Sequence, residues 1–257
     1  MTNDERHDSD RPTARAWPRR LWLDLVVLSL GAVVILIIVL PTLQQTRSHT
    51  RSPCSNSVRS IGIALQAYYA EHGCFPPAYQ ADEQGRPMHS WRVLILPGLG
   101  EQELYEQYDL ASPWNSPNNM ALAEKMPDVY RCPGDTSAGP HDTSYVMIVG
   151  PGTLSDGTGT TRESAFTDGL QNTIAVTEMA RSGIHWMQPQ DLPFDRMSFQ
   201  INDDAEFCIR SEHPGGANVV FCDGSTKFIS DRTDPHIVKT MLTIAGGEDV
   251  SEFFENQ

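Results

Sequence analysis

His213 and Asp223 are the residues whose types and spacing most directly suggest a site in this sequence, with nine residues between them. An imidazole and a carboxylate can together ligate a metal ion or bind a polar ligand. The alternative is structural, because a Pro-Gly-Gly turn follows His213, and Asp223 opens an Asp-Gly pair that is typical of a hairpin turn. The sequence favours this structural alternative and assigns no metal.

His185 and Trp186 form a second candidate site. The indole of Trp186 could line a sugar-binding or peptide-binding surface, although packing inside the protein is the favoured interpretation. Two polar segments, 167–169 and 202–204, carry oxygens that suit calcium but lack the ordered ligand spacing of an EF-hand loop. Calcium is therefore the only cofactor that the sequence leaves open.

The motifs of common catalytic mechanisms are absent from the sequence. It contains no Gly-x-Ser-x-Gly elbow, no His-Glu-x-x-His and no Gly-rich phosphate loop. The 33 acidic residues are scattered, so that no pair of carboxylates stands out. We therefore expect a protein that is not an enzyme.

The charge of the chain excludes one class of partner and is unevenly distributed. The 33 acidic and 19 basic residues give a formal net charge of -14, which excludes a protein that coats nucleic acid. Residues 1–20 hold five arginines and four acids, whereas 14 basic and 28 acidic residues follow Leu43. The excess of acid therefore belongs to the part of the chain after residue 43.

Residues 21–40 are almost wholly apolar, with Asp24 as the only charge. A helix of about 20 such residues spans the roughly 30 Å of a bilayer core. The basic residues before it predict a cytoplasmic N-terminus. We expect a disordered cytoplasmic tail over 1–20, a single-pass transmembrane helix over 21–43 and an extracytoplasmic remainder on the periplasmic side. Asp24 either has a partner in an assembly or is solvated near the membrane surface.

The segment that follows shows helical periodicity. An apolar stripe predicts a helix within 44–73 that ends at His72-Gly73. Pro53 either kinks this helix or starts a new segment. The stripe consists of Val58, Ile61, Leu65, Tyr68 and Tyr69.

Residues 74–257 alternate short apolar runs with turn residues, which predicts an α+β domain with a loop-rich antiparallel sheet. The expected strands are Trp91 to Leu96, Ser144 to Val149, Thr173 to Thr177, Ala217 to Phe221 and Thr226 to Ile229. The expected helices are Glu101 to Tyr108, Met120 to Lys125 and Pro235 to Ile244.

The five cysteines suit an oxidising compartment, and none of them forms a Cys-x-x-Cys pair. The odd number leaves at least one thiol unpaired in a monomer. A disulfide between Cys54 and Cys132 is one of several pairings that the sequence allows.

The order of several motifs resembles a bacterial family of prepilin-type proteins that is numerous in planctomycetes. Its members carry a C-terminal His-(nine residues)-Asp-Gly signature, and part of the family has a solute-binding label. The matching segments include Ser90-Trp91-Arg92, Arg131-Cys132-Pro133-Gly134-Asp135 and the run from His213 to Ser225. One departure is the prepilin-peptidase site: Asp24 stands at its glutamate, but the residues around it do not match. We therefore expect prepilin-type processing to be lost.

The resemblance implies a pseudopilin-like fold, with a long N-terminal transmembrane helix followed by the sheet domain. It also implies a membrane-anchored, non-enzymatic protein that presents its acidic domain for assembly or interaction. The bilayer and a homo-oligomer or pseudopilin-type assembly would be its partners. The alternative is a membrane-tethered module that binds a small solute, a carbohydrate or a cation, with His185, Trp186, His213 and Asp223 at the site.

Overall fold

The computed structural model describes residues 28–30, 54–247 and 253. The chain divides into two units, 1–48 and 49–257, and residues 28–30 are the described part of the first. The predictions for the tail 1–20, for Asp24 and for Pro53 lie outside the described residues. The architecture below is that of the second unit.

The predicted pseudopilin-like fold class is wrong in its main element. Among the described residues, no helix is long and apolar enough to cross a bilayer, and most of 21–43 lies outside them. The longest described helix, residues 54–72, is amphipathic: it buries Val58, Ile61 and Leu65 and exposes Arg59 and Glu71. An apolar stripe of this width packs on protein rather than on lipid. The mixture of helices and strands is as expected.

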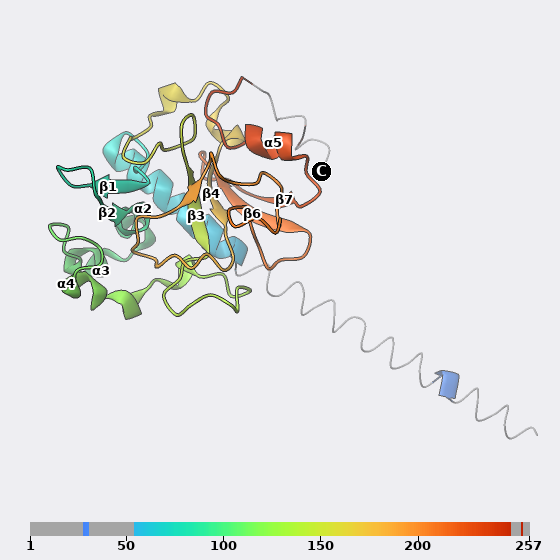
Figure 1. The fold of residues 1–257 in the computed structure, drawn as a ribbon, viewed down its shortest axis with the longest axis horizontal. Coiled ribbons are helices and arrows are strands. Elements are labelled where there is room, and N and C mark those ends of the chain that lie inside the picture. The colour runs from blue at the N-terminus through green and yellow to red at the C-terminus, as the bar shows by residue number, and fades with distance from the viewer. Residues whose placement is uncertain (1–27, 31–53, 248–252, 254–257) are drawn as a thin grey trace, which may run out of the picture. The chain divides into compact units, whose positions relative to one another are not determined.

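A five-stranded sheet organises the domain (Figure 1), in the order β5-β3-β4-β6-β7. Neighbouring strands are antiparallel, except that β3 pairs with β5 in parallel. The strands are β3 (Tyr145–Val149), β4 (Ile174–Glu178), β5 (Leu192–Pro193), β6 (Gly216–Phe221) and β7 (Thr226–Ser230). A separate antiparallel ribbon consists of β1 (Tyr79–Ala81) and β2 (Pro87–Ser90).

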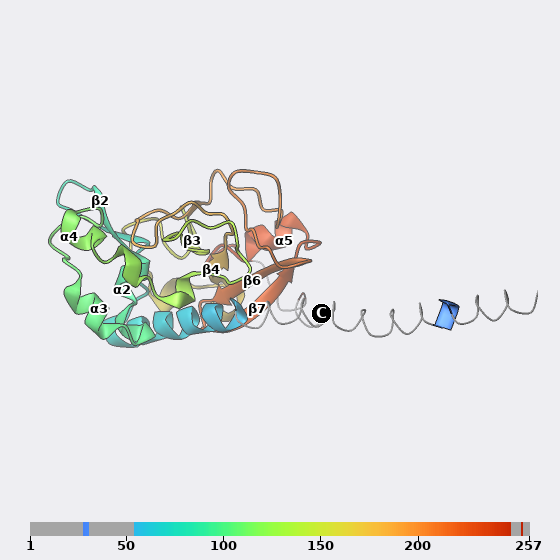
Figure 2. The same cartoon turned by 90° about the horizontal axis from the view of Figure 1, so that it is seen from below.

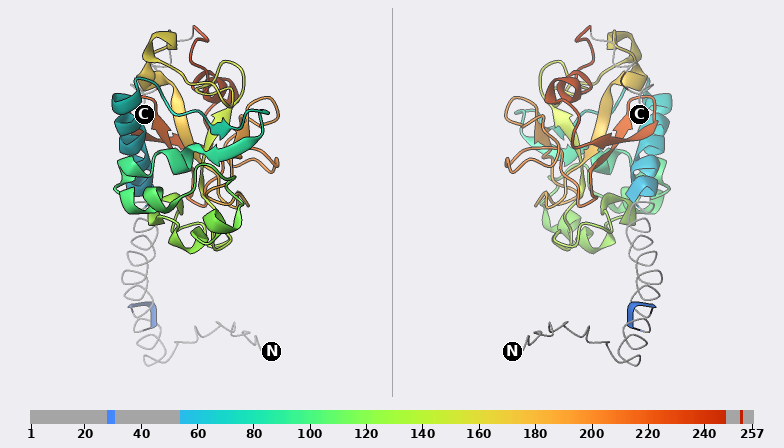
Figure 3. Two further views of the ribbon diagram at one scale, coloured as in Figure 1. Left: turned by 90° about the vertical axis from the view of Figure 1, so that its left-hand side faces the viewer. Right: turned by 90° about the vertical axis from the view of Figure 1, so that its right-hand side faces the viewer.

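Each face of the sheet carries its own apolar cluster, because successive side chains of a strand point to opposite faces. Tyr145 and Met147 of β3 join the cluster that contains the helix of residues 54–72. Val146 and Ile148 join the cluster that contains Val238 of α5 (Pro235–Thr240). Figures 2 and 3 show this helix and α5 on different sides of the strands. The sheet is thus the middle layer.

Short helical turns make up most of the remaining helical structure of the domain. They are α2 (Trp91–Leu94), η1 (Pro97–Leu99), α3 (Gln102–Gln107), α4 (Pro117–Met120), η2 (Ala123–Lys125), η3 (Asp128–Tyr130), η4 (Glu163–Ala165) and η5 (Leu170–Asn172). At η1 the chain lies tightly against the long helix, since a Cβ on Gly98 would stand 2.9 Å from the backbone of Ala64. This close approach sets the spacing between the helix and α3.

The prediction of a strand over Trp91 to Leu96 is wrong, because residues 91–94 form the helix α2. The Ser90 hydroxyl accepts a hydrogen bond from the Arg92 N–H at 3.2 Å and caps the helix. A short apolar run is buried equally well as helix or strand, so that its composition alone did not distinguish the two. The other four expected strands are present within one or two residues.

Arg92 of α2 is fully buried and is the centre of a polar network. Its guanidinium donates to the Asp191 carboxylate at 2.7 Å, to the Tyr145 carbonyl at 3.0 Å and to the Ser90 hydroxyl at 2.7 Å. The same Asp191 oxygen accepts the Trp91 indole N–H at 3.0 Å. The network joins α2, β3 and the loop before β5.

His89 should make the stability of the domain depend on pH. Burial lowers the pKa of this imidazole, whose Nε2 lies 3.0 Å from the Leu110 carbonyl and whose Nδ1 lies 3.1 Å from the Tyr108 hydroxyl. In the unfolded chain the pKa returns to about 6.5. The unfolded state then binds more protons, so that stability falls as the pH drops through about 6.5 and levels off below the folded pKa.

Urea unfolding of the wild type and of His89→Gln at about pH 7.5 and about pH 5.5 checks this expectation. The wild type should lose more stability between the two conditions than the variant does. Equal losses would show that His89 does not carry the pH dependence.

Candidate functional site

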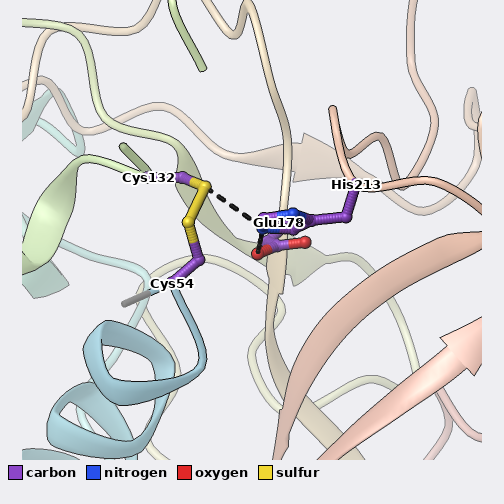
Figure 4. Close-up of side chains that lie close together, drawn as sticks. All are labelled: Cys54, Cys132, Glu178 and His213. Carbon is purple, nitrogen blue, oxygen red and sulfur yellow. Dashed lines mark hydrogen bonds and ion pairs between the residues drawn. A yellow bond between two sulfur atoms is a disulfide. The ribbon is translucent and has the colours of Figure 1, made fainter. Parts of the chain in front are cut away.

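Four potential metal ligands meet beside the sheet (Figure 4): Cys54, Cys132, Glu178 and His213. One ligand atom from each lies within 4.8 Å of the others, and all four residues are buried. The structure joins Cys54 and Cys132 in a disulfide. The His213 Nε2 lies 3.4 Å from the Cys132 sulfur and 3.6 Å from a Glu178 carboxylate oxygen. We call these four residues the Cys-Glu-His cluster.

Four separate elements position the cluster. Cys54 lies in the long helix, and Cys132 follows η3, where its N–H donates to the Ser144 hydroxyl at 3.1 Å. Glu178 is the last residue of β4, and His213 lies in the loop before β6. The cluster therefore fastens the helix to the sheet and to two loops.

Asn218 of β6 holds the Glu178 carboxylate in place. Its backbone N–H donates to one carboxylate oxygen at 2.9 Å and its side-chain amide donates to the other at 2.8 Å. The buried Glu178 charge also acts on its surroundings: burial raises the pKa of the Tyr145 hydroxyl, and the Glu178 carboxylate raises it further. Charge-assisted bonds of this kind fix a carboxylate more firmly than neutral ones.

His213 and Asp223 do not form one site. They flank β6, with His213 before it and Asp223 after it, so that the strand separates them. Asp223 is exposed, and its carboxylate accepts the Ser225 N–H at 2.8 Å within the β6–β7 turn. Gly224 has φ 83°, as the hairpin signal predicted. Asp223 therefore has the structural role that the sequence favoured.

Trp186 and His185 also lie apart from the Cys-Glu-His cluster in the contacts that the structure describes. Trp186 is fully buried in the core, and its indole N–H donates to the Ala123 carbonyl at 3.2 Å. His185 is half-buried beside Trp114 and His141, with ring centroids 5.5 and 5.6 Å away. Burial, followed by the neighbouring His141, lowers the pKa of His185. Trp186 therefore offers no surface to a ligand.

The two segments that could have held calcium use their carboxylates in hydrogen bonds within the chain. Asp168 accepts the N–H groups of Gly246 and Gly247 at 2.6 and 2.9 Å, which fastens the segment after α5. Asp203 accepts the Ser198 hydroxyl at 2.5 Å and the Asp204 N–H at 2.7 Å. These hydrogen bonds explain both segments without an ion.

The sequence analysis missed Glu178 of the cluster and its hydrogen-bond partner Asn218. Glu178 ends the buried run Ile174–Glu178, and a carboxylate is almost never buried without a partner. That position was the one available signal. The hydrogen-bond partner of Glu178, Asn218, lies 40 residues away in the sequence, so that spacing alone did not predict the pair.

A cleft of about 420 Å³ opens on another part of the same domain. The long helix, α2, η1 and α3 surround it. Tyr68 and His72 form a stacked wall, with ring centroids 4.0 Å apart. Burial raises the pKa of the Tyr68 hydroxyl. The polar side chains in the lining are Glu71, Gln80, Gln102 and Tyr105.

The structure thus defines a mixed helix-and-sheet domain with a buried Cys-Glu-His cluster and a separate open cleft. The chain belongs to the family described as "Protein of unknown function (DUF1559)", whose model carries the label SBP_bac_10 and matches residues 44–195 and 195–236. No curated protein matches the chain, and no solved structure does.

Proposed function

We propose that the chain is a non-enzymatic binding protein whose acidic domain takes up a small polar solute, such as a carbohydrate, in the cleft between the long helix and α3. The observation that carries the proposal is the composition and size of this cleft. Its volume of about 420 Å³ falls in the range of roughly 300–1,000 Å³ that is usual for ligand sites.

The walls of the cleft offer the two kinds of contact that a sugar requires. The rings of Tyr68, His72 and Tyr105 supply flat apolar surface, and such rings combine contact area with a polar edge. The amides of Gln80 and Gln102 can both donate and accept hydrogen bonds. Hydroxyl-rich solutes need this combination.

Two further facts favour solute binding. The solute-binding label of the family agrees with it, although the label alone assigns no ligand. The Cys-Glu-His cluster is buried, with the side chains of Glu178 and His213 each 2% exposed. A substrate could not reach these groups unless the domain opened, which supports a binding role over a catalytic one.

Gln102→Ala should weaken solute binding about five- to tenfold. The variant removes an amide from the cleft wall and leaves α3 intact, because alanine favours helix. Losing a hydrogen bond to a bound ligand costs about 1–1.5 kcal/mol, which corresponds to roughly a tenfold change in affinity. Isothermal calorimetry of the full chain with a panel of mono- and disaccharides and with calcium is the measurement.

Gln107→Ala is the matched control, because Gln107 is an exposed residue of the same helix that lies outside the lining of the cleft. It should bind like the wild type. Absence of binding to every solute in the panel, or equal effects of the two variants, would contradict the proposal.

A further inference from the structure

We propose that the Cys-Glu-His cluster is a zinc site whenever the Cys54–Cys132 disulfide is reduced. In this form Cys54, Cys132, His213 and Glu178 would supply two thiolates, one imidazole and one carboxylate to a single Zn²⁺ ion. The inference is independent of solute binding in the cleft, since the two sites share no residue.

Two distances between the ligand atoms already lie near those of tetrahedral coordination. Zinc bonds of about 2.3 Å to sulfur, 2.0 Å to nitrogen and 2.1 Å to oxygen place tetrahedral neighbours about 3.5 Å apart for S and N and about 3.4 Å apart for N and O. The corresponding distances in the protein are 3.4 Å from Cys132 to His213 and 3.6 Å from His213 to Glu178. The two sulfurs, bonded to each other in the disulfide, must separate to about 3.8 Å. The four ligand atoms, which lie within 4.8 Å of one another, must also close around the ion.

The types of ligand select the metal. Thiolate and imidazole together favour zinc over calcium or magnesium, which prefer oxygen ligands. Four protein ligands and no open position are typical of a structural zinc site rather than a catalytic one. In the zinc-bound form the two thiolates and the Glu178 carboxylate would carry three negative charges in a buried site, and Zn²⁺ compensates two of them.

Zinc binding follows reduction of the Cys54–Cys132 disulfide. A dithiol reductant transfers two electrons and two protons to the disulfide, which becomes two cysteine thiols while the dithiol becomes a cyclic disulfide. Zn²⁺ then displaces one proton from each thiol and binds the two thiolates. Oxidation by a disulfide reverses both steps and releases the ion. The helix remains fastened to the sheet in both forms, by a covalent bond in one and by the metal in the other.

The loop after Cys132 gives access to the cluster. Pro133 is exposed, and Gly134 lies directly over the His213 ring, where an added Cβ would stand 3.4 Å from Cε1 and 3.5 Å from the Cys132 sulfur. A displacement of this loop would uncover the disulfide and the imidazole together. A reductant and a metal ion could then enter by one route.

Asn218 would be the positioning residue of the zinc site. Its backbone N–H and its side-chain amide each bind one Glu178 oxygen. Removing a hydrogen-bond partner of a metal ligand weakens metal binding by about 10–100-fold. Asn218→Ala removes the side-chain hydrogen bond, keeps the backbone one and removes no ligand. It should weaken Zn²⁺ binding within this range.

The test is a titration of the full chain with Zn²⁺, in competition with a chromophoric chelator, before and after anaerobic reduction by a dithiol and desalting. The reduced chain should bind one equivalent that the oxidised chain does not bind. His213→Ala should weaken that binding at least tenfold. Co²⁺ in place of Zn²⁺ should give the intense visible spectrum of a tetrahedral ion together with thiolate charge-transfer bands.

The matched control replaces the three other cysteines, Cys74, Cys208 and Cys222, with serine and should keep the full equivalent, since none of them belongs to the cluster. The proposal is overturned if reduction adds no zinc equivalent, or if the control variant loses it. It is overturned equally if Co²⁺ bound to the reduced wild type lacks thiolate bands, a result that does not depend on whether His213→Ala folds.

Discussion

Asp191→Ala is expected to lower the free energy of unfolding by about 3–5 kcal/mol, because it leaves the Arg92 guanidinium charged and unpaired in the core. The side chain of Arg92 is 0% exposed and that of Asp191 is 2% exposed. Water therefore cannot replace the lost carboxylate. The Trp91 indole and the Met147 N–H, which lie 3.0 and 2.9 Å from the same Asp191 oxygen, would lose their acceptor as well.

Urea unfolding followed by tryptophan fluorescence measures this loss. The control is Arg86→Ala, which breaks the 2.6 Å ion pair between Arg86 and Asp82 at the surface. Solvent screens that pair, so that its loss should change stability little. The double variant Arg92→Met, Asp191→Leu should recover part of the stability, because an apolar pair carries no desolvation penalty. Similar effects of Asp191→Ala and Arg86→Ala would contradict the role of the network.

Replacing both Cys54 and Cys132 with serine is expected to cost about 4 kcal/mol under non-reducing conditions. The disulfide closes a loop with a sequence separation of 78 residues, and a cross-link of this span restricts the unfolded chain by about that amount. Because the bond also fastens the long helix to the loop after η3, the helix should become the first element to lose protection from amide hydrogen exchange.

Guanidinium unfolding and hydrogen exchange of the double serine variant check both effects. Cys74→Ser is the control, because Cys74 is a half-buried free thiol; it should unfold at the wild-type denaturant concentration. If the double variant unfolds at that concentration too, the disulfide does not stabilise the domain.

Local signals in the sequence predicted local structure well. The Asp-Gly pair after β6 predicted the hairpin because a two-residue turn needs residues that tolerate positive φ, and Gly224 has φ 83°. The run at Trp91 was misassigned because burial on all sides erases the periodicity that separates helix from strand. Ser90 caps the helix that the structure has there, a signal that the sequence analysis did not use.

The Cys-Glu-His cluster could be predicted only in part. His213 was a candidate from its residue type, and the Cys54–Cys132 pair was one of several allowed disulfides. Glu178 and Asn218 meet them only because β4 and β6 are neighbours in the sheet, and strand order is not encoded in local spacing. Asp223 was grouped with His213 by sequence proximity, whereas β6 keeps them at opposite ends.

The most direct test of solute binding in the cleft is the backbone amide NMR spectrum of the ¹⁵N-labelled full chain, titrated with the same panel of mono- and disaccharides. Binding at the cleft predicts saturable shifts for the amides of Gln80, Gly98 and Gln102, with none at Gly224 in the β6–β7 turn. A spectrum unchanged by every solute, or shifts centred on His185 instead, would contradict a solute site between the long helix and α3.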